Sequence, residues 1–157
     1  MNQSFENFFP QIEKKISAYI RRQGFPSSDL EDLMQEIRLR VWQSWHKLDP
    51  ELEVLPWVYT IARNERLRWL SRRGKHPALN LEPATVATVP QILEQNESSL
   101  AVKEAVQNLS ESQREILVLK FYQNLSFDET SRIVNLPTST VKSQMYKILK
   151  ELAGRLV

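Results

Sequence analysis

SFDETSRIVNLPTSTVKSQMYKILK, residues 126–150, carries the start and stop signals of two helices. Ser126 and Glu129 fit the capping box Ser-x-x-Glu, which predicts a short helix beginning directly after the serine. Asn135 tolerates the left-handed conformation that ends many helices, and Pro137 cannot continue one. The stretch therefore predicts a short helix, a tight turn and a second helix.

The second helix of this pair has two contrasting faces. Thr138 is its predicted N-cap. Apolar residues recur at helical spacing along one stripe, which we expect to be buried. They are Val141, Met145, Ile148, Leu149, Leu152 and Leu156. The opposite face holds hydrogen-bond donors and cations but no acid, namely Ser139, Ser143, Tyr146, Lys147 and Lys150, flanked by Thr140, Lys142 and Gln144. Such a face suits a helix in a DNA major groove, although short capped helix pairs also occur in all-α proteins that bind no DNA.

Composition limits the class of protein. The 157 residues are enough for one or two small domains, and no apolar run approaches the roughly 20 residues of a transmembrane helix. The N-terminus lacks the pattern of a signal peptide, and the chain has no cysteine, so we expect a cytoplasmic protein. His46 and His76 lie far apart and are expected to be solvated. We therefore expect no metal, no cofactor and no catalytic residue.

Charge placement matters more than its sum. A net charge of +2 is too small for the whole molecule to adhere to nucleic acid, so any such binding must come from local patches. One patch is RNERLRWLSRRGK, residues 63–75, with six basic residues and one acid. Basic residues beside an aromatic ring suit single-stranded or distorted nucleic acid. A basic helix end that only favours the helix dipole remains the alternative.

Three helices are predicted before this patch ends. The first runs to about Gln23, and Pro10 either starts it or kinks it. Ser28 and Glu31 fit a second capping box, which predicts a helix that closes before the Asp-Pro pair at 49–50.

The third predicted helix has Pro56 in its first turn. Glu65 interrupts the apolar side of this helix, so its carboxylate needs a partner or a position at the edge of the core.

Residues 76–98 read as a flexible linker, because they contain three prolines and neither lysine nor arginine. We therefore divide the chain into an N-terminal domain (1–75), the linker (76–98) and a C-terminal domain (99–157). In the last domain a short helix precedes another capping box at Ser110 and Gln113. The predicted fold class is all-α, with two small helical domains and a helix-turn-helix at the end of the second.

Three runs of sequence resemble parts of a known family. DLEDLMQEIRLRVWQSWHKLDP (29–50) and PWVYTIARNERLRWLSRR (56–73) resemble region two of bacterial RNA polymerase sigma factors of the extracytoplasmic-function (ECF) type. LSESQREILVLKFYQNLSFDETSRIVNLPTSTVKSQMYKILKEL (109–152) resembles their region four. The runs occur in the family's order and at its typical size.

The resemblance implies a dissociable subunit that is not an enzyme and has no small-molecule substrate. It binds core RNA polymerase, directs it to specific promoters and assists promoter melting. The implied partners are promoter DNA, the clamp helices of the largest polymerase subunit and the flap of the second-largest subunit. Many family members are also held inactive by an anti-sigma factor, but no residue here identifies one.

Three sets of residues correspond by position to functional surfaces of the family. The set on the core-polymerase surface comprises Asp29, Asp32, Leu33, Gln35 and Glu36. The set at the minus-ten promoter element comprises Arg63, Asn64, Arg66, Arg68, Trp69, Arg72 and Arg73. The set at the minus-thirty-five element comprises Thr138, Ser139, Thr140, Lys142, Ser143, Gln144, Tyr146 and Lys147.

The chain departs from the family pattern at several positions in region four. Asn135 replaces the usual turn glycine, Thr130 an apolar residue and Ser131 an alanine, and each substitute is physically tolerable. Gln144 replaces a frequent arginine of the reading helix. That change removes a candidate guanine or phosphate contact, so the family's upstream contacts cannot be copied unchanged.

The main alternative is a free-standing helix-turn-helix transcriptional regulator. Such regulators usually pair two reading helices across a palindrome, and this sequence shows no sustained dimerisation stripe. An enzyme has no support from any nucleophile, metal set or phosphate loop. A pure protein adaptor is disfavoured by the basic patch.

Overall fold

The computed structural model describes residues 4–48, 53–72 and 104–156, and all regular elements within these ranges are helical. The elements are α1 (Phe5–Arg22), η1 (Ser27–Asp29), α2 (Leu30–Trp45), α3 (Val54–Arg72), α6 (Glu111–Leu117), η4 (Val118–Tyr122), α7 (Phe127–Val134) and α8 (Thr138–Leu156). Residues 104–107 add a further helical turn. The all-α prediction is confirmed, while the predicted linker lies outside the described residues.

The first helix begins at Phe5, and the alternative that Pro10 starts it is wrong. Ser4 is the N-cap of α1, and its hydroxyl accepts a hydrogen bond from the Asn7 amide at 3.3 Å. Pro10 therefore lies inside the helix rather than at its start. Gln23 is the C-cap, and Gly24 follows with a φ of 86°, a conformation that glycine adopts without strain.

The predicted capping box at the start of α2 is wrong. Ser28 lies in the 3-10 turn η1, and α2 begins at Leu30 with Asp29 in the N-cap position. The Asp29 side chain makes no capping hydrogen bond. Acidic Glu31 and Asp32 in the first turn still favour this helix end, because negative charge is stabilised at a helix N-terminus.

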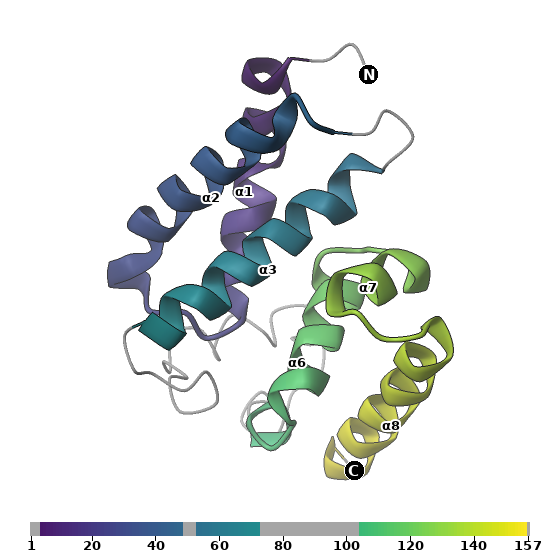
Figure 1. Cartoon of the computed structure of the whole chain (residues 1–157). Coiled ribbons are helices and arrows are strands. Elements are labelled where there is room, and N and C mark those ends of the chain that lie inside the picture. The colour runs from purple at the N-terminus through teal and green to yellow at the C-terminus, as the bar shows by residue number, and fades with distance from the viewer. Residues whose placement is uncertain (1–3, 49–52, 73–103, 157) are drawn as a thin grey trace.

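Helices α1, α2 and α3 pack around an apolar core in the N-terminal half of the chain, residues 4–72 as described (Figure 1). Its fully buried members include Ile16, Ile20, Leu33, Ile37, Val41, Val58 and Ala62. Glu65 is only 3% exposed at the edge of this core. Its carboxylate pairs with Arg68 at 2.7 Å and Arg40 at 3.0 Å, which confirms that it needed partners.

Two predicted capping boxes form in the C-terminal half, residues 104–156. Ser110 and Gln113 exchange both capping hydrogen bonds at the start of α6, and Ser126 and Glu129 do the same at α7. Asn135 ends α7 in the left-handed conformation with a φ of 58°, as predicted.

Two backbone features between α6 and α7 were not predicted. The chain continues from α6 as one π-helical segment, η4. Asn124 then takes a second left-handed conformation, with a φ of 55°.

Two predictions for α8 are wrong. Thr138 is the first helical residue rather than the N-cap, and the carbonyl of Pro137 accepts the bond from the Val141 amide. Leu149 is 45% exposed, although it was assigned to the buried stripe. Adjacent helical residues point about 100° apart, so Leu149 cannot face the core beside fully buried Ile148. The rest of the stripe whose side chains are described is buried.

The two halves pack against each other. Helix α3 lies against α7, and α1 contacts η4, so that residues of both halves join one buried cluster. Figure 1 shows α6, α7 and α8 grouped on one side of α3. The arrangement places Arg63 and Arg66 of α3 beside α6 of the C-terminal half.

Candidate functional site

The polar face of α8 is open to solvent. Lys142, Ser143, Tyr146, Lys147 and Lys150 line a shallow hollow along it, and Tyr146 is 79% exposed. Ser139 is exposed as well, whereas Thr140 and Gln144 are partly buried, as expected for flanking positions. The face therefore offers hydroxyl donors and three lysines on one rigid helix.

Helix α7 fixes the start of α8. The Thr138 hydroxyl donates to the Asp128 carboxylate at 3.1 Å. The Lys142 ammonium lies 5.8 Å from the centre of the Phe127 ring, and the Lys120 ammonium lies 4.7 Å from the same ring. Attraction between a cation and an aromatic face holds both lysines near the N-terminus of α7. This brings positive charge to the edge of the polar face of α8.

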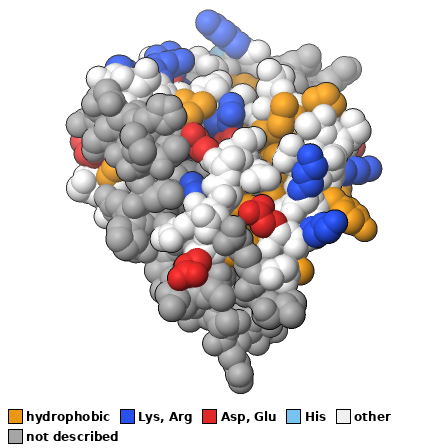
Figure 2. Space-filling view, turned by 90° about the horizontal axis from the view of Figure 1, so that it is seen from below, with side chains coloured by type: hydrophobic (Ala, Val, Ile, Leu, Met, Phe, Trp, Pro, Cys, Tyr) orange, Lys and Arg blue, Asp and Glu red, His pale blue; other side chains and the backbone are white. Residues whose placement is uncertain are grey.

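The face of the molecule shown in Figure 2 carries its positive charge in several groups. The visible Lys and Arg side chains of the described residues do not form one continuous patch, and acidic side chains lie among them. This distribution agrees with the small net charge of +2, which favours local over general attraction to nucleic acid.

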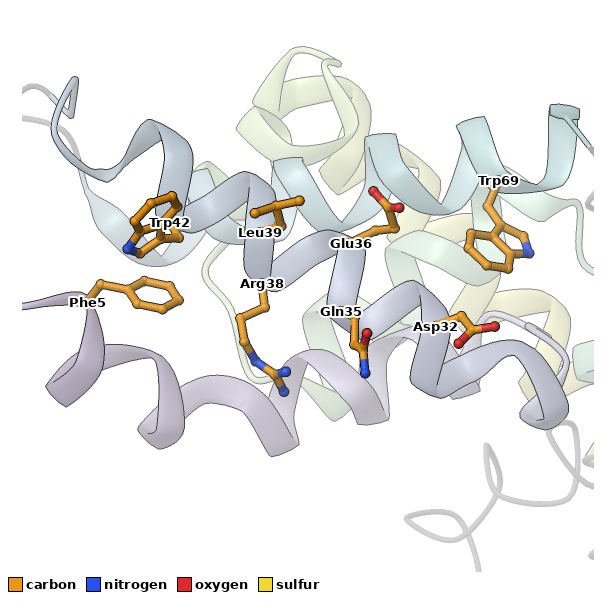
Figure 3. A pocket seen from close by; sticks show the side chains of 8 residues that line it. All are labelled: Phe5, Asp32, Gln35, Glu36, Arg38, Leu39, Trp42 and Trp69. Carbon is orange, nitrogen blue, oxygen red and sulfur yellow. The ribbon is translucent and has the colours of Figure 1, made fainter.

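A groove runs along the outer side of α2. Asp32, Gln35 and Glu36 line it, as do Leu39 and Trp42 further along the helix (Figure 3). Phe5 of α1, Arg38 of α2 and Trp69 of α3 complete the lining. Three of the predicted polymerase-binding residues therefore share one surface.

Two members of that predicted set differ from their neighbours. Leu33 has 0% exposure and lies in the core, so it supports the surface without forming part of it. Asp29 is partly buried at the start of α2 and does not line the groove. Sequence reasoning missed Leu39 and Trp42, which are 47% and 48% exposed. The available signal was that both are apolar yet lie off the buried stripe of their helix.

The predicted minus-ten residues divide into exposed and covered groups. Asn64, Arg68 and Arg72 are exposed on α3. Arg66 is 1% exposed and Trp69 is 8% exposed. Arg63 is partly buried, and Arg73 lies outside the described residues. The structure thus does not present this set as one open surface.

Arg63 and Arg66 are covered because both contact Glu115 of α6. The Arg63 Nε donates to both carboxylate oxygens at 2.9 Å, and the Arg66 Nη2 donates to Oε2 at 3.2 Å. The Tyr19 hydroxyl of α1 donates to the same Oε2 at 2.7 Å. We call Tyr19, Arg63, Arg66 and Glu115 the Glu115 cluster. It joins α1 and α3 of one half to α6 of the other.

The protonation states in this cluster follow from burial and charge. Burial, with the neighbouring Glu115 carboxylate, raises the pKa of Tyr19 well above its usual value, so the phenol stays neutral and donates its proton. Burial acts to lower the pKa of Arg66, but Tyr19, Glu115 and Glu111 outweigh it, and the pKa is raised. Arg66 is therefore a buried, permanently charged group.

Gln123 forms a second polar connection between the halves. Its Nε2 donates to the Tyr59 hydroxyl at 2.7 Å and to the Lys15 carbonyl at 2.9 Å. The Arg22 Nη1 donates to the Gln123 Oε1 at 2.9 Å. Sequence reasoning missed Gln123, Glu115 and Tyr19, because their partners lie about 50 to 110 positions away and leave no local pattern.

Two other kinds of site are lacking in the part of the chain that the structure describes. No group of three or more His, Cys, Asp or Glu side chains there is placed to hold a metal ion. Nor does any helix among those residues have the length and apolar character to cross a membrane. His46 is exposed, as expected, and His76 lies outside the described ranges.

Family comparisons match both halves of the chain. The model of Sigma-70 region 2 matches residues 8–76, and that of Sigma-70, region 4 matches residues 99–152. The ECF RNA polymerase sigma factor RpoE of Cereibacter sphaeroides is 28% identical over 95% of this chain and 84% of its own length. The ECF RNA polymerase sigma factor SigK of Mycobacterium tuberculosis is 26% identical over 98% of this chain and 86% of its own length.

Solved structures show the same fold. The sigma factor RpoE of Bartonella quintana, in complex with the anti-sigma factor NepR, superposes with a TM-score of 0.71 at 17% identity, covering 97% of this chain and 96% of that one. CnrH, in complex with the cytosolic domain of CnrY, gives a TM-score of 0.70 at 20% identity, with 97% and 86% covered. Because the two family matches fall on the two helical halves in order, the chain belongs to the sigma-70 family and is an ECF sigma factor, a transcription initiation factor that binds core RNA polymerase and directs it to specific promoters.

Proposed function

We propose that this sigma factor uses three surfaces, of which two are open in the structure and one is partly covered. The α2 groove binds core polymerase, the polar face of α8 reads the minus-thirty-five element, and the basic end of α3 acts at the minus-ten element. The observation that carries this proposal is the acid-free polar face of α8. It lies on a different element from the α2 groove, so both surfaces can be occupied at once.

The α2 groove combines the features of a protein-binding surface. Its exposed Leu39 and Trp42 offer apolar anchors, and Asp32, Gln35 and Glu36 supply a polar margin. Aromatic and apolar anchors surrounded by polar groups carry most of the energy in protein interfaces. We propose that these residues bind the clamp helices of the largest polymerase subunit. The C-terminal half then binds the flap of the second-largest subunit.

The polar face of α8 is proposed to lie in the major groove of the minus-thirty-five element. Ser139, Ser143 and Gln144 supply donors and acceptors for base edges, while Lys142 and Lys147 contact phosphates. Thr138 and Thr140 flank these groups on the same helix, and Tyr146 lies on the polar face with them. Since Gln144 stands where arginine is frequent, we expect adenine to be favoured over guanine at the base that it faces.

The minus-ten surface is proposed to include Asn64, Arg68 and Arg72, which are already exposed. Arg63 and Arg66 join it only if the C-terminal half moves, because both are paired with Glu115 of that half. Trp69 is 8% exposed and packs against Phe25 within the N-terminal half. Together the set holds cations for phosphate and one large aromatic ring for an unstacked base. Arg73 remains a proposed member of this set.

Other expectations also remain proposals. The division into domains at 1–75 and 99–157 is supported by the two family matches, which end at 76 and begin at 99. We propose a cytoplasmic protein without enzymatic activity. An anti-sigma factor is a proposed partner, supported by the complexes in which RpoE of Bartonella quintana and CnrH were solved.

The deciding experiment is transcription in vitro with purified core RNA polymerase on a library of promoter fragments. We expect the factor to produce starts at a subset of promoters that share upstream and downstream elements. Core enzyme alone is the control. Starts no more promoter-dependent than those of core alone would refute the proposal, and tight binding to a duplex site without core would instead favour a free-standing regulator.

A further inference from the structure

The structure contains a contact that opposes the proposed use of α3. Arg63 and Arg66 belong to the proposed minus-ten surface, yet both donate to the Glu115 carboxylate of the C-terminal half. An arginine fork binds a carboxylate or a phosphate through the same planar donors. Occupied donors on a side chain that is 1% exposed, as in Arg66, cannot reach DNA at the same time.

We propose that the Glu115 cluster is an internal lock, in which a carboxylate of the C-terminal half occupies the arginines of α3 and keeps the free factor in a closed, DNA-incompetent state. Opening separates the two halves and releases Arg63 and Arg66 for nucleic acid. This inference rests on the proposed role of α3 at the minus-ten element.

Glu115 is a buried carboxylate that accepts hydrogen bonds from three side chains. Its side chain is 4% exposed and accepts from Arg63, Arg66 and Tyr19, which come from two different helices of the other half. Loss of the carboxylate charge would leave Arg66 buried with only the more distant Glu111, at 3.7 Å. Removing one partner of a buried ion pair lowers the free energy of unfolding far more than removing one partner of an exposed ion pair. The buried pairing at Glu115 therefore adds strongly to the apolar packing of α3 against α7 in holding the closed state.

The lock is also incompletely satisfied, which makes it suited to opening. The buried Nε and Nη1 atoms of Arg66 have no hydrogen-bond partner. A buried donor without an acceptor costs free energy that is recovered when the group reaches water or another acceptor. Opening would let these two atoms form hydrogen bonds. Phosphate oxygens of DNA would serve the same purpose.

Most other described polar contacts between the halves gather around Gln123. It connects to Tyr59, Lys15 and Arg22, and the Arg22 guanidinium also lies 4.8 Å from the centre of the Tyr122 ring. Burial lowers the pKa of Arg22, which again marks a charged group partly removed from water. Interfaces between domains that separate are more polar than permanent ones. The contacts around Gln123 and Glu115 fit that description.

The lock is tested by measuring the distance between the halves in the full-length chain. The protein has no cysteine, so Gln43→Cys and Ala153→Cys, both at exposed positions, provide two unique sites for fluorescent labels. We expect Glu115→Gln to increase the label separation, because it removes the charge at nearly constant shape. Tyr19→Phe, which deletes one donor and keeps the ring, is expected to give a smaller increase. Circular dichroism checks that both variants remain helical.

The matched control is Glu53→Gln. Glu53 also pairs with an arginine of the C-terminal half, Arg132 at 3.0 Å, but their side chains are 58% and 48% exposed. The same substitution at this exposed pair should leave the separation unchanged. An unchanged separation in both Glu115→Gln and Tyr19→Phe would overturn the lock.

A second readout is binding of the free factor to a single-stranded oligonucleotide carrying minus-ten sequences. If the closed state holds about 90% of the molecules, full opening by Glu115→Gln should raise the apparent affinity about tenfold, because affinity scales with the competent fraction. A greater label separation without tighter oligonucleotide binding would refute the proposal that the Glu115 cluster covers a DNA-binding surface. Promoter-dependent transcription with core polymerase tests the sigma function independently of either result.

Discussion

Glu65 and Glu115 are two buried glutamates that differ in where their partners lie. Each side chain is about 4% exposed, and each carboxylate pairs with two arginines. Glu65 binds Arg40 and Arg68, which are 51% and 47% exposed and belong to the same half of the chain. Glu115 binds Arg63 and Arg66, which are 26% and 1% exposed and belong to the other half. We call Arg40, Glu65 and Arg68 the Glu65 cluster.

The exposure of the arginines determines what each cluster can contact. In the Glu65 cluster the arginines keep half of their surface in water, so they stabilise α3 while still able to meet a phosphate. In the Glu115 cluster Arg66 is removed from solvent and Arg63 is partly covered, so the same ion-pair chemistry withholds these arginines from DNA. Burial of the cation, rather than the presence of an ion pair, separates a supporting contact from an inhibitory one.

The largest expected effect comes from Glu115→Ala. Removing the acceptor should destabilise the closed chain by about 3–5 kcal/mol, because it leaves Arg66 as a poorly compensated buried charge. Denaturant unfolding is expected to change from one transition to two as the halves uncouple. A single transition with unchanged midpoint would mean that the Glu115 cluster contributes little to closure.

Glu65→Ala should cost less, about 1 kcal/mol, because Arg40 and Arg68 can turn to water once the carboxylate is gone. We expect the unfolding transition to remain single, since this cluster lies within one half. The comparison fails if Glu65→Ala separates the halves as strongly as Glu115→Ala does.

Lys142 and Lys147 extend the comparison to lysines that are exposed to solvent. If each contacts a phosphate of the minus-thirty-five element, Lys142→Ala and Lys147→Ala should each lower the salt slope of upstream DNA binding by about 0.9. Titrations of the polymerase complex at several salt concentrations measure this slope. Slopes equal to that of the wild type would remove the two lysines from the proposed surface.

The smallest effect is expected for Glu53→Gln. The pair with Arg132 is exposed on both sides, and such pairs contribute about 0.2–1 kcal/mol at most. Thermal unfolding should therefore move by no more than a few degrees from the wild type. A loss as large as that of Glu115→Ala would show that exposure does not distinguish the contacts between the halves.

Local signals in the sequence predicted helix ends well where both partners of a cap lie within four residues. The capping boxes at Ser110 and Ser126 and the left-handed Asn135 were confirmed for this reason. Ser28 lies inside the 3-10 turn η1, so that Asp29 takes the N-cap position of α2. Thr138 is already helical, and its hydroxyl binds Asp128 of the preceding helix instead of capping α8.

For the candidate site, the polar face of α8 was predicted from periodicity alone, since 3.6 residues per turn fix which side chains share a face. The α2 groove was predicted only in part. Leu39 and Trp42 were missed although they are apolar residues off the buried stripe, and Leu33 was assigned to the surface by family position although periodicity places it on that stripe. The covering of Arg63 and Arg66 could not be predicted, because it depends on residues about 50 positions away.

The helical class, the helix-turn-helix, the family and the charged faces could all be predicted from residue order, because each of these follows from the spacing of neighbouring residues. Which basic side chains reach solvent could be seen only in the folded chain. Exposure depends on which surface another part of the chain covers, and here α6 brings the Glu115 carboxylate onto α3. The charge of a residue follows from its type, but its exposure to solvent depends on how the chain packs.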